Sequence, residues 1–269
     1  MSLAPWGARD AIPAVKLLCI PCAAMDDVRH WLVLGHSGTR GEGLDGAPPW
    51  PPLLEALLAA QGLPVRITAI DLFPNGAKAA DFALRKVAES APEAVLVSLN
   101  AYPCAVPVVS REVRERFGER AGRIYGRVER AWQRHTARRR APAAIERTVR
   151  MIAHRAAGAR PMVTVAAAAE AYILVLERLT ALEGPRPVVI GEVPFSAALR
   201  RRHPRAMARV RELQALVRPV ADGRRIDWID LGEELAGTPD SDLWQTDGVH
   251  LSARGNELYA AVLARRLRD

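Results

Sequence analysis

Residues 31–43 have the sequence WLVLGHSGTRGEG, in which an uninterrupted apolar run ends at a glycine and is soon followed by a serine. The run at 31–35 predicts a β-strand buried on both faces, as strands are in parallel sheets. Ligands of doubly wound sheets bind beyond the carboxyl ends of the strands. We therefore expect Ser37 to lie at an edge of the sheet that a substrate can reach.

The rest of the chain alternates between strand-like and helix-like segments. Apolar runs predict strands at 31–35, 65–72, 94–99, 187–193 and 226–231. Helical spacing predicts helices at 53–61, 77–90, 164–182, 207–217 and 256–267, and a loop rich in glycine and proline is expected at 41–52. This alternation predicts an α/β fold, namely a three-layer α/β/α sandwich with a parallel five-stranded sheet. We expect residues 1–269 to form a single domain.

One stretch departs from this alternation, because about ninety residues separate Asn100 from Pro187 where a short crossover is usual. Residues 111–160 contain fifteen arginines, five glutamates and no aspartate or lysine, a formal balance of +10 against +8 for the whole chain. We expect an Arg-rich helical insertion at about 103–160, broken near Ala141 and Pro142.

Arginines in the first half of this insertion recur mostly every three to four residues, which predicts one basic helical face. They are Arg111, Arg114, Arg116, Arg120, Arg123, Arg127, Arg130 and Arg134, with Tyr125 and Trp132 between them. The face could be simply solvated, cover a pocket as a lid, bind an acidic substrate or carrier protein, contact an anionic membrane surface or pair with a second subunit. Nucleic acid is not expected, because nothing here reads bases and glutamates interrupt the patch.

The overall composition is that of a soluble globular protein, with 49% hydrophobic residues and a mean hydropathy of −0.03. Three cysteines are too few for a disulfide framework. Cys19 and Cys22 have CxxC spacing without a second pair for zinc, so a redox pair and an accidental spacing both remain open. Lys16 interrupts the apolar stretch of a poor signal peptide, and 161–176 is too short and polar to span a bilayer. We expect a cytoplasmic protein.

Polar groups that follow the predicted strands supply a complete hydrolytic set. A serine hydroxyl is a weak nucleophile until a base takes its proton, histidine has a suitable pKa, and a carboxylate must orient the imidazole. Ser37, His250 and Asp247 can fill these three roles. The backbone N–H groups of Ser37 and Gly76, with the side-chain amide of Asn100, can stabilise the oxygen that becomes negative.

Each of these residues also has a purely structural interpretation. The serine or the histidine could cap a helix, Asp247 could make a turn with the glycine after it, Asn100 could cap a strand end, and Asn75-Gly76 is a common turn. The chemical interpretation is preferred because the pieces occur together.

Two other histidines are weaker candidates for the base. His30 has an aspartate, Asp27, three residues before it, but it precedes the first strand whereas Ser37 follows it, about 23 Å away at 3.3 Å per residue. His36 is adjacent to the serine, and neighbouring side chains of extended backbone point apart, so we expect His36 to shape the pocket. Thr39, Arg40 and Glu42 are interpreted as parts of a solvated loop.

Four blocks of the sequence resemble the signature blocks of the SGNH (GDSL-type) hydrolase family. GHSGT at 35–39 resembles the nucleophile block Gly-Asp-Ser-Leu, and Gly76 stands where the family has the glycine of its second block. SLNA at 98–101 resembles Gly-x-Asn-Asp, and DGVHLS at 247–252 resembles Asp-x-x-His. The resemblance covers 31–100 and 187–267, outside the Arg-rich insertion.

The sequence departs from that pattern at three positions, where His36, Ser98 and Ala101 replace the usual aspartate, glycine and aspartate. None of them is a triad or oxyanion position in the family. An α/β-hydrolase is the alternative for the order serine, aspartate, histidine, but its Gly-x-Ser-x-Gly elbow is absent around Ser37.

The resemblance implies a serine ester hydrolase, esterase- or lipase-like, with the triad Ser37, Asp247 and His250 and the oxyanion hole Ser37, Gly76 and Asn100. It implies no metal and no organic cofactor. The substrate expected is a small-molecule ester, and whether it is acidic or carrier-bound stays open, as does oligomerisation. Two alternatives remain: an acyltransferase with the same triad, and a non-catalytic binding protein that uses the basic insertion.

Overall fold

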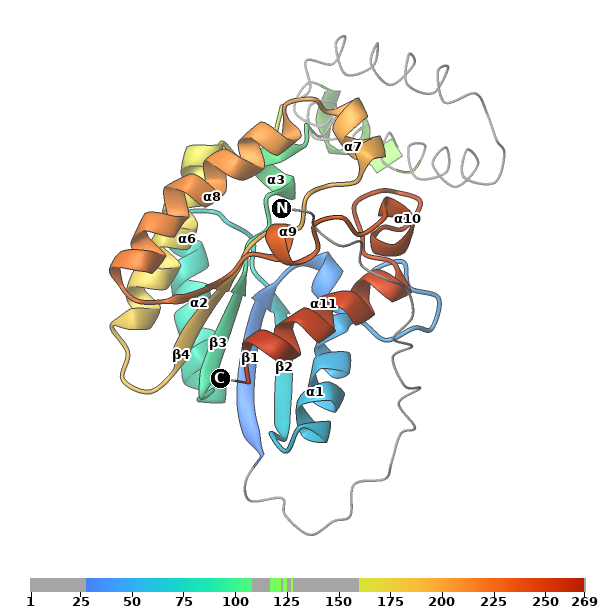
Figure 1. The fold of residues 1–269 in the computed structure, drawn as a ribbon. Helices are drawn as coiled ribbons and strands as arrows, with labels where there is room; N and C mark the ends of the chain where they lie inside the picture. Colours follow the sequence, from blue (N-terminus) through green and yellow to red (C-terminus); the bar gives the residue numbers. More distant parts are fainter. Residues whose placement is uncertain (1–27, 108–116, 122, 125–126, 128–159, 269) are drawn as a thin grey trace, which may run out of the picture.

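The structure is a computed structural model that describes residues 28–107, 117–121, 123, 124, 127 and 160–268. Its centre is a five-stranded, wholly parallel sheet with the strand order β2-β1-β3-β4-β5 (Figure 1). The strands are β1 (Arg29–Gly35), β2 (Val65–Asp71), β3 (Ala94–Ser98), β4 (Arg186–Ile190) and β5 (Asp227–Ile229). The predicted α/β fold with a parallel five-stranded sheet is confirmed.

Helices cover both faces of this sheet, because the central strands alternate their apolar side chains between two cores. Leu32 and Leu34 belong to one core and Trp31 and Val33 to the other, and all four are buried. The first core is closed by α2 (Ala77–Ser90), α6 (Val165–Thr180) and α8 (Ala206–Gly223), and the second by α1 (Trp50–Ala60) and α11 (Ala253–Arg266). Because both faces of such a strand are buried, its sequence is a continuous apolar run, as at 31–35.

Several boundaries differ from those predicted. Helix α1 begins at Trp50 inside the expected loop, because a helix accommodates prolines in its first turn. Helix α11 begins at Ala253, three residues early, because the Ser252 hydroxyl caps it by accepting from the Gly255 N–H at 2.9 Å. Strands β4 and β5 are shorter than the apolar runs at 187–193 and 226–231, which continue into the loops beyond the sheet edge.

Among the residues that the structure describes, five short helical segments were not predicted, because each is too brief to show a helical period. They are η2 (Ser37–Arg40), α3 (Tyr102–Ala105), α7 (Ala197–Arg202), α9 (Leu231–Glu234) and α10 (Asp240–Leu243). All five lie in connections that follow the carboxyl ends of strands. They therefore shape the same edge of the sheet.

The strand order places a topological switch point between β1 and β3. The chain leaves β1 for β2 on one side and later returns to pair β3 with the other side of β1, with Leu34 opposite Val97. Loops at such a point diverge to opposite faces and leave a crevice at the carboxyl ends of the strands. Ser37 and Asn100 follow these two strands.

Most of the predicted Arg-rich insertion lies outside the described residues, as do its predicted break at 141–142 and the CxxC pair. Residues 117–121, 123, 124 and 127 are described and are helical. A single domain with a helical insertion stays a prediction. Within the described residues, no helix combines the length and apolarity that crossing a membrane requires.

A buried asparagine fastens the last helix to the first. The Asn256 Oδ1 accepts from the Trp50 N–H at 2.9 Å, and its Nδ2 donates to the carbonyl of Ser252 at 2.9 Å. The asparagine is 1% exposed, so water cannot replace either partner. Trp50 also stacks on Tyr259 of α11, with 5.0 Å between ring centroids.

Replacing this asparagine should destabilise the fold. Asn256→Ala leaves the Trp50 N–H without its acceptor, and we expect the free energy of unfolding to fall by about 1–3 kcal/mol. Chemical denaturation measures the change. The neighbouring exposed control Glu257→Gln should change it by no more than about 0.5 kcal/mol. Equal stability of the two variants would contradict the role given to Asn256.

Candidate functional site

Ser37 opens a single 3₁₀ turn at the carboxyl end of β1. His36 caps this turn: its Nδ1 accepts from the Gly38 N–H at 3.2 Å, and its own N–H donates to Thr39 Oγ1 at 3.1 Å. A Cβ on Gly35 would lie 2.1 Å from Thr39 Oγ1, so only glycine fits before the cap. Thr39 is buried, which corrects its interpretation as part of a solvated loop.

His36 is held as a neutral cap. Burial, together with repulsion from His250, lowers the pKa of His36 to about 4. Its Nδ1 is occupied by the Gly38 N–H, so this nitrogen is not available to deprotonate Ser37. We find no contact that assigns His36 a direct part in shaping a pocket, and its observed role is to hold the turn.

The structure brings Ser37, His250 and Asp247 into a hydrogen-bonded row. The Ser37 Oγ lies 3.1 Å from His250 Nε2, and His250 Nδ1 lies 2.6 Å from Asp247 Oδ2. His30, in contrast, hydrogen-bonds to Thr68 and to the Ser90 carbonyl from near the amino end of β1.

The loop before α11 positions the carboxylate and the imidazole together. Asp247 Oδ1 accepts from the N–H groups of Val249 at 2.8 Å and His250 at 3.0 Å, so the aspartate also makes the turn of its structural interpretation. Gly248 has φ +73°, and a Cβ there would lie 2.2 Å from Ser196 Oγ. Only glycine meets both conditions, which accounts for the Asp-Gly pair.

The pair of Asp247 and His250 shifts both pKa values in opposite directions. Burial alone would raise the pKa of Asp247, but the hydrogen bonds from the His250 side chain and from two backbone N–H groups outweigh it and hold that pKa below its ordinary value. The same hydrogen bond raises the pKa of His250 above its ordinary value, against burial and with help from the charges of Asp247 and Glu42. The imidazole is therefore a stronger base than a free histidine.

Gln245 joins the loop of the serine to the loop of the histidine. Its Nε2 donates to the Glu42 carbonyl at 2.9 Å and to the Leu251 carbonyl at 3.0 Å, while its N–H donates to the His250 carbonyl at 2.8 Å. A Cβ on Gly43 would lie 2.4 Å from Gln245 Oε1, so the two loops are in close contact. Sequence reasoning missed this residue, because a lone glutamine before a turn carries no chemical signal.

The three predicted oxyanion donors follow β1, β2 and β3. Gly76 precedes the first turn of α2 with φ +69°, a conformation that favours glycine. Asn100 Oδ1 accepts from the Tyr102 N–H at 3.2 Å, which leaves its Nδ2 as the donating end. Within the described residues, none accepts a hydrogen bond from Ser37 N–H, Gly76 N–H or Asn100 Nδ2. Their role as oxyanion donors stays a prediction.

Two further side chains hold the loop that carries Asn100. The Tyr172 hydroxyl accepts from the Asn100 N–H at 2.9 Å, and Glu192 Oε2 accepts from the Ala101 N–H at 2.6 Å. Glu192 follows the end of β4, and Tyr172 comes from α6. The family pattern has an aspartate where this chain has Ala101, so Glu192 brings a carboxylate to that loop from the neighbouring strand. Its position just past an apolar strand end was the signal that sequence reasoning did not use.

Burial raises the pKa of Glu192 to about 7, and the hydrogen bond from the Ala101 N–H opposes this rise only in part. The carboxyl group is therefore close to half protonated at neutral pH.

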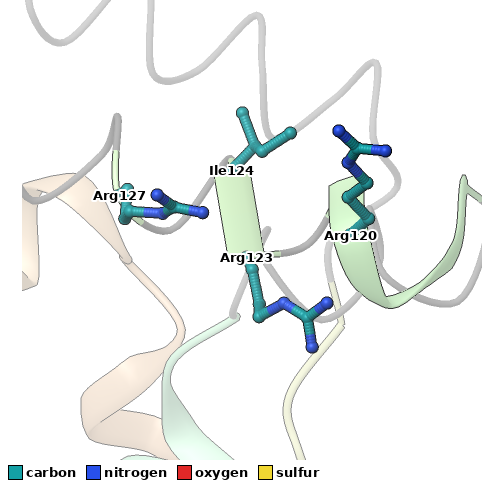
Figure 2. A pocket seen from close by; sticks show the side chains of 4 residues that line it. All are labelled: Arg120, Arg123, Ile124 and Arg127. Carbon is teal, nitrogen blue, oxygen red and sulfur yellow. The ribbon is translucent and has the colours of Figure 1, made fainter.

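Described residues of the Arg-rich insertion line a separate hollow. Arg120, Arg123, Ile124 and Arg127 surround a cavity of about 550 Å³ (Figure 2). All four residues are exposed, and the lining includes none of the triad or oxyanion residues. The exposed arginines agree with the predicted basic face, whose role stays a prediction. In the described part of the chain, no cluster of His, Cys, Asp or Glu could hold a metal ion.

Comparison with known proteins identifies the family of the chain. Over residues 33–258 the chain matches the model of the GDSL-like Lipase/Acylhydrolase family. The chain belongs to this family. The resemblance to the SGNH (GDSL-type) hydrolases is thus confirmed at the level of the family.

Solved structures show the same fold. The GDSL-like chain is similar to the lipase/acylhydrolase from Enterococcus faecalis, with 19% identity, a TM-score of 0.57, and coverage of 89% of this chain and 95% of that one. It is similar to TesA, with 15% identity, a TM-score of 0.55, and coverage of 89% and 98%. Curated protein sequences contain no significant match. At these identities the structural likeness establishes the fold.

The raised pKa of Glu192 predicts a pH-dependent stability. The folded state holds this proton more tightly than the unfolded state, so the group lowers the free energy of unfolding as pH rises from about 4.5 to about 7. In Glu192→Gln the side chain keeps an oxygen that can accept the hydrogen bond from the Ala101 N–H, but it no longer gains or loses a proton in this pH range. The free energy of unfolding of the variant, relative to that of the natural protein, should therefore rise by up to about 3 kcal/mol between pH 4.5 and 8. Chemical denaturation at each pH measures this difference.

The exposed Glu183→Gln is the matched control and should show no such gain. A constant stability difference between Glu192→Gln and the natural protein across this pH range would show that the carboxyl group is not perturbed.

Proposed function

We propose that this GDSL-like protein is a serine ester hydrolase in which Ser37 is the nucleophile. The observation that carries the proposal is the continuous row of Ser37 Oγ, His250 and Asp247, at 3.1 Å and 2.6 Å. A hydroxyl hydrogen-bonded to an imidazole that a carboxylate orients is the arrangement that nucleophilic catalysis requires.

Acylation begins when Ser37 Oγ attacks the ester carbonyl carbon and His250 Nε2 takes the serine proton. Asp247 remains ionised, holds the Nδ1–H tautomer and stabilises the imidazolium that forms. The tetrahedral intermediate then collapses: the bond from carbon to the alcohol oxygen breaks, and His250 gives the proton to that oxygen. The products of this half-reaction are a free alcohol and an ester on Ser37.

The developing oxyanion is stabilised by the Ser37 N–H, the Gly76 N–H and Asn100 Nδ2. Such donors stabilise the transition state more than the ground state when the fold already holds them in place. The hydrogen bonds from the backbone of residues 100–102 to Tyr172, Glu192 and the Asn100 side chain restrain one of the three donors.

Deacylation repeats the same steps with water. His250 takes a proton from water, whose oxygen attacks the acyl carbon, and the proton returns to Ser37 Oγ as the acid leaves. An acceptor alcohol in place of water would make the protein an acyltransferase with the same residues. Product analysis with an added alcohol separates the two reactions.

Family membership supports ester chemistry, since the family is one of lipases and acylhydrolases. The similar structures carry titles of a lipase/acylhydrolase and of an acetyl xylan esterase, the latter with 14% identity and a TM-score of 0.52. The chemistry needs no metal or organic cofactor. The substrate we propose is a small-molecule ester, and cytoplasmic location remains part of the proposal.

The nucleophile is tested by labelling with a fluorophosphonate, which reacts with activated serines. We expect the natural protein to be labelled and Ser37→Ala to be unlabelled, with turnover lowered by several orders of magnitude and little change in folding stability. Ser241→Ala removes an exposed serine and should label like the natural protein. Labelling that persists in folded Ser37→Ala would refute the assignment.

The role of Asp247 is tested by the pH dependence of kcat/KM. The base must be neutral, so the rate should rise as pH passes the raised pKa of His250. Asp247→Asn should lower kcat by about a thousandfold or more and move this rise to lower pH. The exposed Asp222→Asn should leave both unchanged. If the pH profile of Asp247→Asn were not shifted, Asp247 would not be the group that raises the pKa of the base.

A further inference from the structure

A second carboxylate lies beside the nitrogen that would carry the proton. Glu42 Oε2 is 3.8 Å from His250 Nε2, the same nitrogen that lies 3.1 Å from Ser37 Oγ. Asp247 occupies the other ring nitrogen, so the two carboxylates approach the imidazole at different ends. The mechanism above uses Asp247 and leaves Glu42 without a role.

The backbone around Glu42 is fixed from two directions. Its N–H donates to the Ser37 carbonyl at 3.3 Å, and its carbonyl accepts from Gln245 Nε2 at 2.9 Å. The side chain is 62% exposed, so its carboxylate faces the solvent side of the site. Glu42 is thus solvated, as expected, and it also lies at the edge of the reacting centre.

The charge of Glu42 is not cancelled by its neighbours in the described part of the chain. Its recorded ionic contact there is with His250, and Arg40, two residues away, pairs instead with Asp71 at 2.8 Å. His36, which also faces His250, is held neutral. Among the described residues, the recorded ion pairs therefore leave the Glu42 carboxylate without an arginine or lysine partner.

The leaving alcohol must come close to the Glu42 carboxylate. To receive the proton, its oxygen has to come within about 3 Å of His250 Nε2. The carboxylate is 3.8 Å from that nitrogen, so the alcohol oxygen comes within about 7 Å of Glu42. The charged group of a two-carbon alcohol lies a few ångströms from that oxygen and, on the side of Glu42, stands within about 7 Å of the carboxylate. In a solvent-exposed site, a unit charge at such a distance changes a rate by about 3- to 10-fold.

We propose that Glu42 is a specificity-determining residue for the alcohol half of the ester, which favours a cationic alcohol and disfavours an anionic one. This inference rests on the proposed function. It predicts a positive charge on the alcohol half of the ester, whereas the Arg-rich insertion suggested an acidic substrate, which is negatively charged. A carboxylate attracts a positive group on the alcohol and repels a negative one as the transition state forms.

The test compares three acetate or butyrate esters whose alcohols share a two-carbon spacer. The alcohols are choline, its neutral isostere 3,3-dimethylbutanol and the anionic 2-sulfoethanol. The measured quantity is kcat/KM, because it reports acylation, the step in which the alcohol leaves. In the natural protein we expect the order cationic, neutral, anionic, with about 3- to 10-fold between neighbours at low salt and less at high salt.

Glu42→Gln should bring the three kcat/KM values together, so that the ratios between the cationic, neutral and anionic esters approach one. Asp45→Asn, an exposed acid three residues on in the same loop, is the matched control and should keep the order. In Glu42→Gln the rise of kcat/KM with pH on the neutral ester should also move to lower pH, because the carboxylate contributes to the raised pKa of His250. A merely structural loop residue would not move that profile.

The experiment separates a failure of this inference from a failure of the proposed function. Selectivity by charge that survives in active Glu42→Gln, or that is absent from the active natural protein, overturns this inference and leaves the hydrolase intact. No turnover of any ester together with no fluorophosphonate labelling of Ser37 overturns the proposed function itself, and this inference with it.

Discussion

The pairing of β1 with β3 is the constraint on which the rest of the site depends. These parallel strands are in register, with Leu34 opposite Val97, and their connections leave to opposite sides of the sheet. Ser37 and Asn100 therefore follow neighbouring strand ends, although they come from segments far apart in the chain. A slip of one residue in this pairing would exchange the two cores and change the position of both groups relative to each other.

Two carboxylates and a neutral histidine set the electrostatic environment of His250. Asp247 and Glu42 approach its two nitrogens, while His36, which interacts electrostatically with His250, is kept neutral chiefly by burial. The first two make the imidazole more basic, and the third avoids a positive charge beside a forming imidazolium. The departure from the family at His36 is compatible with this balance because a neutral imidazole nitrogen still accepts the hydrogen bond of the cap.

Much of the site could be predicted from the sequence because its members stand at strand ends or in short fixed spacings. Asp247 and His250 are three residues apart, and one turn with Gly248 joins them. Glu192 also stands just past a strand end, but nothing near it in the sequence indicates which group it contacts, and Tyr172 and Gln245 lack even that signal. All three act through hydrogen bonds to the backbone of loops that are remote in sequence, and such bonds leave no pattern in the residues that make them.

By itself, the sequence determined the alternation of strands and helices, the parallel sheet and the positions of the groups suited to ester chemistry, because burial on both faces dictates apolar runs and strand ends dictate polar turns. Only the tertiary structure decided which groups meet. The distance between Glu42 and His250, and the carboxylate that Glu192 brings to the Asn100 loop, follow from how β1, β3 and β4 align, and that alignment is set by packing over the whole domain rather than by any local run of residues.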